Sequence, residues 1–358
     1  MEIITSVDDN YAMHLGAMIV SIFENTQFPE EISLNILNSG LSTENRDKFF
    51  YCVESYGGKI QFLEIDSKRF EKFHERSYIN RTAYYRIVIP ELFSNEQKVI
   101  YLDCDIILEE DITKLYNIDI SDYHVAATCD ENKFLSKEIG LDVKDYFNSG
   151  VLIINIEKWR KLKLTEKIVE YIIGPLNKKN TCDQDALNYV IKGNYYNLGY
   201  EWNYIYDNHF YFIGNRDFKP KLIHFAGNKP WGVFSNNPYK SQYEKYIKLS
   251  PWKNEYETLI NDFHSKKIAI FGASLGGENL YERLKMLNIE ICYFVDNDSS
   301  KWGKMFNGKT IICPTDLVNI NNLVICIGSI TYQMEITHQL TELGFVLHPF
   351  QPGFYIKS

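Results

Sequence analysis

The stretch VIYLDCDIIL, residues 99–108, is an apolar run that two acidic residues interrupt. The apolar flanks predict a buried strand, where an unpaired carboxylate is costly and two nearby carboxylates repel each other. Asp103 and Asp105 would share one strand face, roughly 7 Å apart, and Cys104 would point to the opposite face. Where the strand ends and bends, both carboxylates could turn toward one divalent cation, and Mg²⁺ or Mn²⁺ suits such oxygen ligands. The alternative is a solvated turn at the strand end.

The residues before this stretch alternate between strand-like and helix-like segments. Strands are predicted at EIITSV (2–7), ISLNILNSG (32–40) and KIQFLEI (59–65), with helices between them. This βαβαβ order predicts an α/β fold with a mostly parallel sheet covered by helices. Ligands of such sheets bind beyond the carboxyl ends of the strands, so Asp8–Tyr11 and Asp103–Asp105 can reach the same site.

The alternation continues after residue 110. We expect strands at HVAATCD (124–130) and VLIINI (151–156), with an Asn-Ser-Gly turn directly before the second, and a helix around EKIVEYII (166–173). Residues 195–235 are rich in aromatic residues and turn formers, so they are interpreted as irregular loops.

A second unit begins after a polar joint, His264-Ser265-Lys266-Lys267. The strand KIAIF, the tight turn GASLGG, a helix and the strand ICYFVDND form a small βαβ unit of their own. We therefore divide the chain into domains 1–262 and 263–358.

The turn that opens this second unit fits two patterns. GASLG at 272–276 matches G-x-S-x-G of hydrolases, but too little chain follows Ser274 for the acid and histidine of such an enzyme. A Rossmann-like turn fits better, with Ser274 at the second glycine position and Asp296 closing the next strand. The run resembles small nucleotide-binding-like modules appended to bacterial surface-polysaccharide enzymes. Two roles stay open: binding of a nucleotide or sugar nucleotide, and a scaffold or oligomerisation role.

Composition narrows the function classes. The net charge is -9 and no basic block occurs, which argues against nucleic acid as the main partner. The seven cysteines are scattered without C-x-x-C spacing, which is typical of reduced thiols in a cytoplasmic protein. We expect no signal peptide and no spanning helix, so any contact with the inner face of a membrane would be peripheral.

Further polar side chains stand next to predicted elements: Arg86, Asn148, Asp183, Gln184, His224 and Lys229. An arginine suits an anion or a sugar hydroxyl. Single residues have ordinary explanations, because His224 could be a buried core histidine, Asp183 a helix cap and Lys229 a surface lysine. Their order along one chain is much harder to obtain by accident.

That order resembles glycosyltransferase family 8, retaining enzymes of the GT-A fold that use UDP-galactose or UDP-glucose. The matching segments lie within about residues 1–235. They are VDDNY (7–11), YYR (84–86), YLDCDIIL (101–108), FNSGVLIIN (147–155), DQDALN (183–188) and HFAGNKPW (224–231). The resemblance implies a GT-A type mixed, mostly parallel sheet in domain 1–262, which would be catalytic.

The resemblance also implies which residues bind the metal and the donor. Asp103, Asp105 and His224 would hold Mn²⁺, with Mg²⁺ as the alternative, and Lys229 would grip the diphosphate. In many members two residues separate the H-x-x-G glycine from this lysine, whereas here only Asn228 does. The donor-binding stretches comprise Asp8, Asn10, Tyr11, Arg86, Asp103, Cys104, Asp105, Gly227 and Lys229.

The candidate catalytic residues match positions around the donor sugar: Arg86, Asn148, Asp183 and Gln184. Negative charge develops on the leaving diphosphate, and a divalent ion and a lysine can stabilise it. A double displacement would need a carboxylate on the β face of the sugar, where the resemblance places the amide of Gln184. An amide is a poor nucleophile, so we predict front-face substitution.

We therefore predict a metal-dependent retaining hexosyltransferase. It would move glucose or galactose from a UDP-sugar to a glycan, glycolipid or glycoprotein acceptor in bacterial surface polysaccharide or glycoconjugate synthesis. The alternatives are a nucleotide-sugar hydrolase and a sugar-nucleotide-binding protein without turnover. The choice of hexose and the acceptor stay open, and the aromatic loops 204–212 and 231–239 are candidate acceptor contacts.

Overall fold

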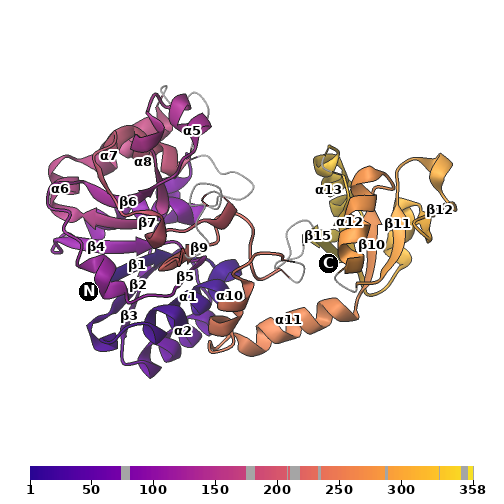
Figure 1. Ribbon diagram of the computed structural model, residues 1–358, viewed down its shortest axis with the longest axis horizontal. Coiled ribbons are helices and arrows are strands. Elements are labelled where there is room, and N and C mark those ends of the chain that lie inside the picture. Colours follow the sequence, from indigo (N-terminus) through magenta and orange to yellow (C-terminus); the bar gives the residue numbers. More distant parts are fainter. Residues whose placement is uncertain are drawn as a thin grey trace. The chain divides into compact units, whose positions relative to one another are not determined.

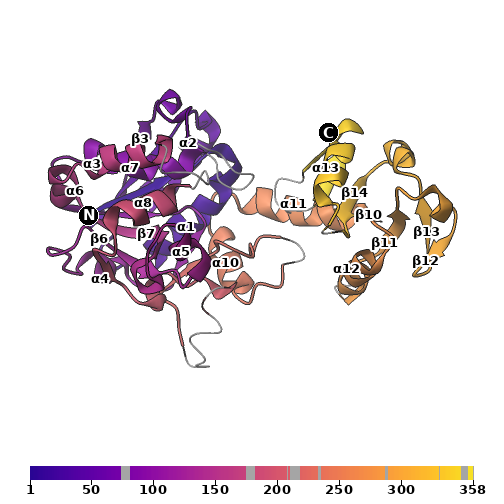
Figure 2. The ribbon, with the colours of Figure 1, turned by 90° about the horizontal axis from the view of Figure 1, so that it is seen from above.

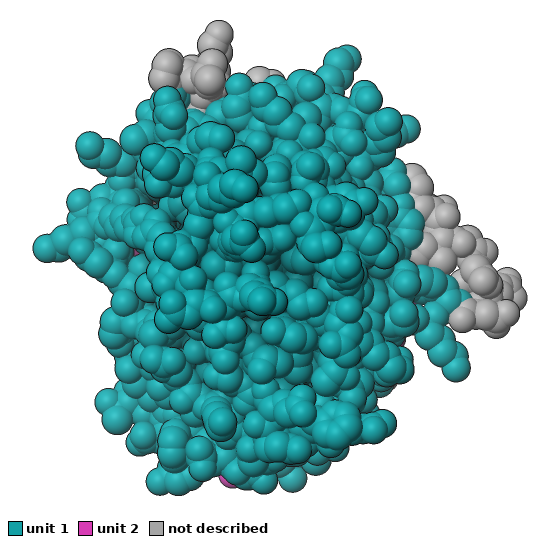
Figure 3. All heavy atoms as spheres, turned by 90° about the vertical axis from the view of Figure 1, so that its left-hand side faces the viewer, with its two compact units in different colours: residues 1–228, 241–253 teal, residues 229–240, 254–358 magenta. Residues whose placement is uncertain are grey.

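The chain divides into two compact units. The first comprises residues 1–228 and 241–253, and the second comprises 229–240 and 254–358. Figure 3 shows one face of the first unit, coloured teal. A computed structural model describes residues 1–73, 81–174, 182–207, 209, 218–232, 235–286, 289–329, 331–347 and 354–357.

The first unit contains a seven-stranded mixed sheet in the order β3-β2-β1-β4-β7-β6-β8 (Figure 1). Neighbours among β3, β2, β1 and β4 run parallel, whereas β7 runs antiparallel to both β4 and β6. The predicted α/β fold with a mostly parallel sheet is confirmed. The strands are β1 (Glu2–Ser6), β2 (Ser33–Asn38), β3 (Lys59–Glu64), β4 (Lys98–Leu102), β6 (Val125–Cys129), β7 (Phe147–Asn155) and β8 (Tyr195–Asn197).

Helices cover both faces of this sheet (Figure 1). α1 (Ala12–Glu24) and α2 (Thr43–Ser55) connect the first three strands on one side. α6 (Ile156–Lys161), α7 (Leu164–Ile173) and α8 (Asp183–Ile191) cover the other side. Among the described residues before the second sheet, the other α-helices are α3 (Ile89–Leu92), α4 (Ile112–Tyr116), α5 (Lys133–Glu138), α10 (Lys240–Ile247) and α11 (Lys253–Ser265).

The stretch 99–108 is not one strand. β4 ends at Leu102, residues 103–105 form a bend, and β5 (Ile106–Leu108) belongs to a separate two-stranded sheet with β9 (Leu222–His224). β5 and β9 are antiparallel, and Ile106 pairs with His224. The prediction of irregular loops over 195–235 is therefore wrong where β8 and β9 form.

The two-stranded sheet is attached to α1 by side chains of that helix. Ser21 Oγ accepts a hydrogen bond of 2.9 Å from the backbone N–H of Leu108. Asn25, which caps the end of α1, donates through Nδ2 to the carbonyl of Leu108 at 3.0 Å. These bonds satisfy backbone groups of β5 that β9 leaves unpaired.

A second difference concerns the segment Asn148–Gly150. The sequence predicts a turn there, but all three residues lie within β7, where Asn148 pairs with Thr128 of β6. The β6–β7 register shifts between Ala126 and Thr128, so the ladder bends beside these residues.

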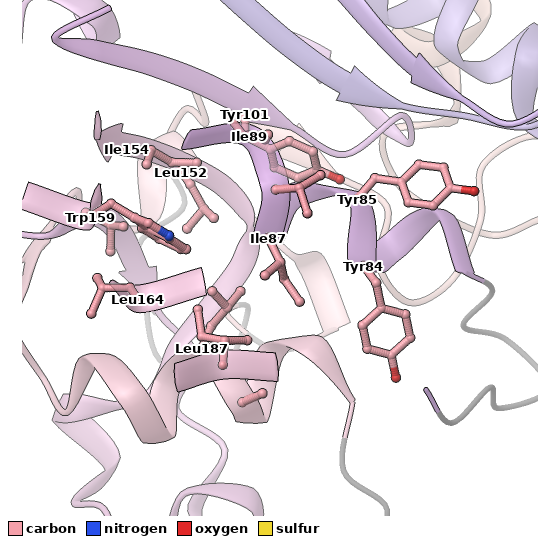
Figure 4. Close-up of a cluster of buried hydrophobic side chains, with 14 of the residues drawn as sticks. Tyr84, Tyr85, Ile87, Ile89, Tyr101, Leu152, Ile154, Trp159, Leu164 and Leu187 are labelled. Atoms are coloured by element: carbon pink, nitrogen blue, oxygen red, sulfur yellow. The ribbon is translucent and has the colours of Figure 1, made fainter. Parts of the chain in front are cut away.

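A 3₁₀ helix, Arg81–Val88, is anchored in the apolar core beneath the sheet (Figure 4). Its members Tyr84, Tyr85 and Ile87 are completely buried. Because its neighbours are held in the core, Arg86 is itself only 4% exposed. The same cluster includes Ile89, Tyr101, Leu152, Ile154, Trp159, Leu164 and Leu187.

The second unit contains its own seven-stranded sheet in the order β12-β13-β11-β10-β14-β16-β15. Its helices α12 (Leu275–Met286) and α13 (Gln333–Glu342) pack on opposite faces of β10, each over a separate apolar cluster (Figure 2). The central strands β13, β11, β10 and β14 are parallel. The strands are β10 (Lys267–Phe271), β11 (Ile291–Val295), β12 (Met305–Phe306), β13 (Lys309–Ile312), β14 (Leu323–Ile327), β15 (Phe345–Leu347) and β16 (Phe354–Lys357).

Across the described ranges, no helix has the length and apolar character needed to cross a membrane.

Candidate active site

Asp103, Asp105 and His224 meet where the two sheets of the first unit adjoin. The acids occupy the bend between β4 and β5, and the histidine is the last residue of β9. His224 Nε2 lies 3.3 Å from Asp105 Oδ1 and 3.7 Å from Asp103 Oδ2. One ligand atom from each of the three lies within 4.8 Å of the others. We call these residues the Asp–Asp–His group.

The chemistry and surroundings of this group fit a divalent cation. Two carboxylates and an imidazole are ligands that Mn²⁺ accepts, and carboxylates also suit Mg²⁺. A Cβ at Gly150 would overlap Cε1 of His224 and lie 2.7 Å from Asp103 Oδ2, so the glycine keeps this space open. Within the described ranges, this is the only cluster of three or more His, Cys, Asp or Glu side chains close enough to share an ion.

Arg86 holds two of the acids in place. Its Nη2 donates to Asp103 Oδ1 at 2.9 Å, and its Nε lies 3.2 Å from Asp183 Oδ2. Burial alone would lower the pKa of Arg86, but the carboxylate of Asp103 and its neighbours raise it, so the guanidinium is charged. Tyr101 also donates to Asp103 Oδ1, at 2.8 Å. Asp103 Oδ1 is therefore engaged by the protein, whereas Oδ2 is turned toward His224.

Asp183 is buried opposite the same arginine. Burial raises the pKa of its carboxyl, and the charge of Arg86 opposes that rise. Ser149 Oγ lies 3.4 Å from Asp183 Oδ2, and Arg86 Nη1 donates to the Ser149 carbonyl at 2.6 Å. Arg86 thus links the start of α8 to β7, because it pairs with Asp183 of α8 and donates to Ser149 of β7.

Gln184 lies between β7 and Asp130. Its Oε1 accepts from the backbone N–H of Ser149 and from Asn148 Nδ2, both at 3.1 Å. Its Nε2 donates to Asp130 Oδ2 at 2.7 Å. Burial raises the pKa of Asp130 to about 6, although the Gln184 amide favours its charged form. Both ends of the glutamine side chain are therefore held in one orientation.

Asn203 connects this amide chain to the Asp–Asp–His group. Its Oδ1 lies 2.9 Å from Nδ1 of His224, and its Nδ2 donates to Asn148 Oδ1 at 2.9 Å. Hydrogen bonds thus run without interruption from His224 through Asn203, Asn148 and Gln184 to Asp130.

The remaining residues of the expected site lie in three places. Asp8 accepts from the N–H of Tyr11 at 3.2 Å and caps the 3₁₀ turn after β1, which is parallel to β4, so this turn lies at the same sheet edge as Asp103. Cys104 is partly exposed in the bend, and Asn10 is exposed in the turn. A Cβ at Gly227 would overlap the carboxylate of Asp207.

Lys229 belongs to the second unit, where its Nζ lies 5.5 Å from the ring centroid of Trp231. Parts of the two aromatic loops, at 208, 210–212 and 233–234, lie outside the described residues.

Sequence patterns assign no role to four residues of this network: Tyr101, Asp130, Gly150 and Asn203. Asp130 directly follows β6, as Asp103 follows β4, so an acid at a strand end was an available signal. Asn203 carries no such signal, because its place depends on the pairing of the neighbouring Tyr204 with Ile223 of β9.

Comparisons with known proteins identify the family. The model of glycosyl transferase family 8 matches residues 2–233, and the model named C2185-like, N-terminal, matches residues 264–346. General stress protein A of Bacillus subtilis (strain 168) is 35% identical over 279 residues, which are 73% of this chain and 98% of that protein. A lipopolysaccharide 1,2-glucosyltransferase of Escherichia coli is 26% identical, over 69% of this chain and 78% of that protein.

A solved structure shares its fold with a large part of this chain. The galactosyltransferase LgtC, in complex with donor and acceptor sugar analogs, superposes with a TM-score of 0.64 at 25% identity. The alignment covers 71% of this chain and all of that one. Since the family model spans more than half of the sequence, the chain belongs to glycosyltransferase family 8 and is a glycosyltransferase of the GT-A fold.

Proposed function

We propose that this glycosyltransferase moves glucose or galactose from a UDP-sugar to a carbohydrate acceptor, with retention at the anomeric carbon. The observation that carries the proposal is the Asp–Asp–His group joined by hydrogen bonds to the Asn148–Gln184 amide pair. The named relatives support the hexose class, since one is a glucosyltransferase and one a galactosyltransferase.

The proposed metal ligands are Asp103 Oδ2, Asp105 and His224 Nε2, with Mn²⁺ or Mg²⁺ as the ion. When bound, the ion supplies positive charge to the leaving diphosphate. Arg86 and Tyr101 keep the Asp103 carboxylate in the orientation that presents Oδ2. In this proposal Asp8, Asn10 and Tyr11 contact the nucleoside, and the Gly227–Lys229 segment contacts the diphosphate.

The arrangement of carboxylates supports front-face substitution. Asp183 is paired with Arg86, and Asp185 Oδ1 accepts from the Tyr146 hydroxyl at 2.7 Å. The Gln184 oxygen already accepts from two donors, which makes this amide still less suited to attack. The acceptor oxygen would bond to the anomeric carbon on the face from which UDP leaves, while the acceptor proton passes to the departing phosphate oxygen.

This mechanism has a direct test. Gln184→Ala should keep measurable turnover, because the side chain orients the sugar and forms no bond to it. Mass spectrometry of the wild-type protein with donor alone should find no glycosyl adduct. An adduct on Asp183 or Asp185 would show that the reaction is a double displacement.

The transferase itself is tested by release of UDP. Purified protein is given UDP-glucose or UDP-galactose, with Mn²⁺ or EDTA, and with or without a panel of bacterial surface saccharides. Release that needs both metal and acceptor supports the proposal. Release without acceptor would indicate the hydrolase, and binding without release would indicate the inactive binding protein. Neither alternative is favoured, because the lipopolysaccharide 1,2-glucosyltransferase and LgtC are both named as transferases.

For residues 263–358 we propose a Rossmann-like accessory domain in a cytoplasmic enzyme of surface-glycan synthesis, with a scaffold or oligomerisation role. Asp296 Oδ2 accepts from the Ala273 N–H and from Lys301 Nζ, both at 2.9 Å. The acid expected at a nucleotide ribose is thus already engaged within the unit. Calorimetry of the full chain against NAD, CoA and nucleotide sugars tests this: a second binding site beyond that of the donor would contradict it.

A further inference from the structure

We propose that Asn203 is a positioning residue that fixes the tautomer of His224, so that Nε2 presents its lone pair between Asp103 and Asp105. This inference rests on the proposed function in one respect, namely that the Asp–Asp–His group holds a divalent cation. A neutral imidazole binds a metal through the nitrogen that carries no proton, and the hydrogen bond at the other nitrogen decides which one that is.

The oxygen and nitrogen atoms of the side-chain amides can be assigned from a backbone N–H, which is always a donor. The backbone N–H of Gly150 lies 3.0 Å from one terminal atom of the Asn148 side chain. An N–H can only donate, so this atom of Asn148 is the oxygen. The opposite atom is then the amide nitrogen, which agrees with its donation to Gln184 Oε1.

The same oxygen of Asn148 has a second neighbour, a terminal atom of Asn203 at 2.9 Å. An oxygen facing an oxygen would leave both without a hydrogen, so this atom of Asn203 is its nitrogen. The oxygen of Asn203 therefore faces Nδ1 of His224, also at 2.9 Å. That oxygen can only accept, so Nδ1 of His224 carries a proton, and Nε2 is the nitrogen left to bind a cation.

The surroundings of Asn203 favour a lasting hydrogen bond to Nδ1 of His224. It is completely buried, so solvent does not compete for its amide. The next residue, Tyr204, is bonded to β9 through both of its backbone groups: its N–H donates to Leu222 O at 3.0 Å, and its carbonyl accepts from the His224 N–H at 2.9 Å. These bonds therefore hold the backbone next to Asn203 and that of His224 in a fixed relative position.

Two substitutions of Asn203 test the role of its acceptor Oδ1 separately from the role of its donor Nδ2. Asn203→Ala removes the acceptor, so both tautomers of His224 become accessible. Asn203→Asp keeps an oxygen toward Nδ1 but offers no hydrogen to Asn148 Oδ1. The aspartate variant should therefore preserve the metal site while loosening the link to Asn148.

The experiment is a Mn²⁺ titration of the full-length protein, followed by electron paramagnetic resonance without donor or acceptor. We expect Asn203→Ala to raise the Mn²⁺ Kd roughly 10- to 100-fold, the range seen when a partner behind a metal ligand is lost. Asn203→Asp should remain near the wild-type Kd. Asn35→Ala is the matched control: Asn35 is 1% exposed in β2 and bonds Glu2 rather than the site, so its loss should leave the Kd unchanged.

The outcomes distinguish this inference from the proposed function. If His224→Ala weakens Mn²⁺ binding while Asn203→Ala does not, the positioning role is wrong and the metal site stands. If His224→Ala binds Mn²⁺ like the wild type, the metal site itself is wrong, and the inference falls with it.

A second measurement needs no substitution at Asn203. Long-range ¹H–¹⁵N correlation spectra of the metal-free protein report which ring nitrogens of His224 carry a proton. The His224 signals are assigned by their loss in His224→Ala. A proton on Nδ1 is expected, and an Nδ1 without a proton overturns the inference.

Discussion

Among the residues of this site, Arg86 is the one whose replacement should destabilise the fold most. It is 4% exposed and neutralises Asp103 and the buried Asp183. Arg86→Ala should lower the free energy of unfolding by about 3–5 kcal/mol, because it leaves a buried carboxylate without its partner. Urea denaturation measures the loss.

Arg69→Ala is the control for this prediction. Arg69 makes a two-pronged ion pair with Glu91 at 2.7 and 2.8 Å, but both side chains are 44% exposed. A pair in that setting contributes about 1 kcal/mol or less. Equal losses in the two variants would mean that burial does not decide the value of the Arg86 pairs.

Asp130 should make stability depend on pH in a predictable direction. Burial raises its pKa to about 6, whereas an unfolded chain has a value of about 3.9. The stabilising contribution of the neutral carboxyl is complete below about pH 4 and is lost as the pH rises through about 6. A shift of about two units corresponds to about 3 kcal/mol.

Asp130→Asn removes this titration. We expect the unfolding free energy of the variant, relative to wild type, to rise by up to about 3 kcal/mol between about pH 4 and pH 7. Chemical denaturation at several pH values measures the difference. Parallel pH profiles for the two proteins would show that Asp130 is charged in the fold throughout.

Among the secondary-structure elements, β7 contributes Gly150 to the site, at a position that has no room for a side chain. A Cβ there would overlap the His224 ring and crowd Asp103 Oδ2. We expect Gly150→Ala to fold, because its strand pairing is through the backbone, but to lose Mn²⁺ binding by at least about tenfold. Circular dichroism checks the fold and the Mn²⁺ titration checks the site. Unchanged binding would place the metal elsewhere.

The strands of the first half could be predicted because each is an apolar run between polar turns. β5 and β9 could not, since each has only three residues and pairs with a strand far away in the sequence, with Ile107 and Ile223 116 positions apart. Asn148 and Gly150 are turn formers by type, yet pairing with β6 holds this segment in a strand. Tertiary pairing here overrides local preference.

The site was predictable to the extent that its residues stand in ordered motifs. Asp103, Asp105 and His224 could be named from sequence, and the structure brings them within reach of one ion. Asn203 could not be named, because a single asparagine among aromatic residues has no pattern. Its proposed role depends on the direction of two hydrogen bonds, which only the structure shows.

On the scale of the whole molecule, the two units carry separate apolar cores. All proposed metal ligands belong to the first unit. We therefore expect two thermal transitions by calorimetry, of which only the one from the first unit responds to Mn²⁺. At 100 times the Kd the ion stabilises that unit by about 2.7 kcal/mol, which corresponds to roughly 5–10 °C.

EDTA should return that transition to its metal-free position and leave the other unchanged. Asp105→Ala provides the matching control, since its first transition should no longer move with Mn²⁺. Movement of both transitions together would mean that the units unfold as one.

The alternation of donors and acceptors from Gly150 to His224 also bears on how this protein can evolve. Whether each side-chain atom donates or accepts a hydrogen bond is set by the preceding residue in this chain. A substitution that turns a donor into an acceptor therefore leaves two acceptors facing each other until the neighbouring residue also changes. Positions 148 and 203 should therefore show epistasis, with pairs tolerated where the single substitutions are not. A combinatorial library at these two positions should recover compatible pairs, and not independent choices at each.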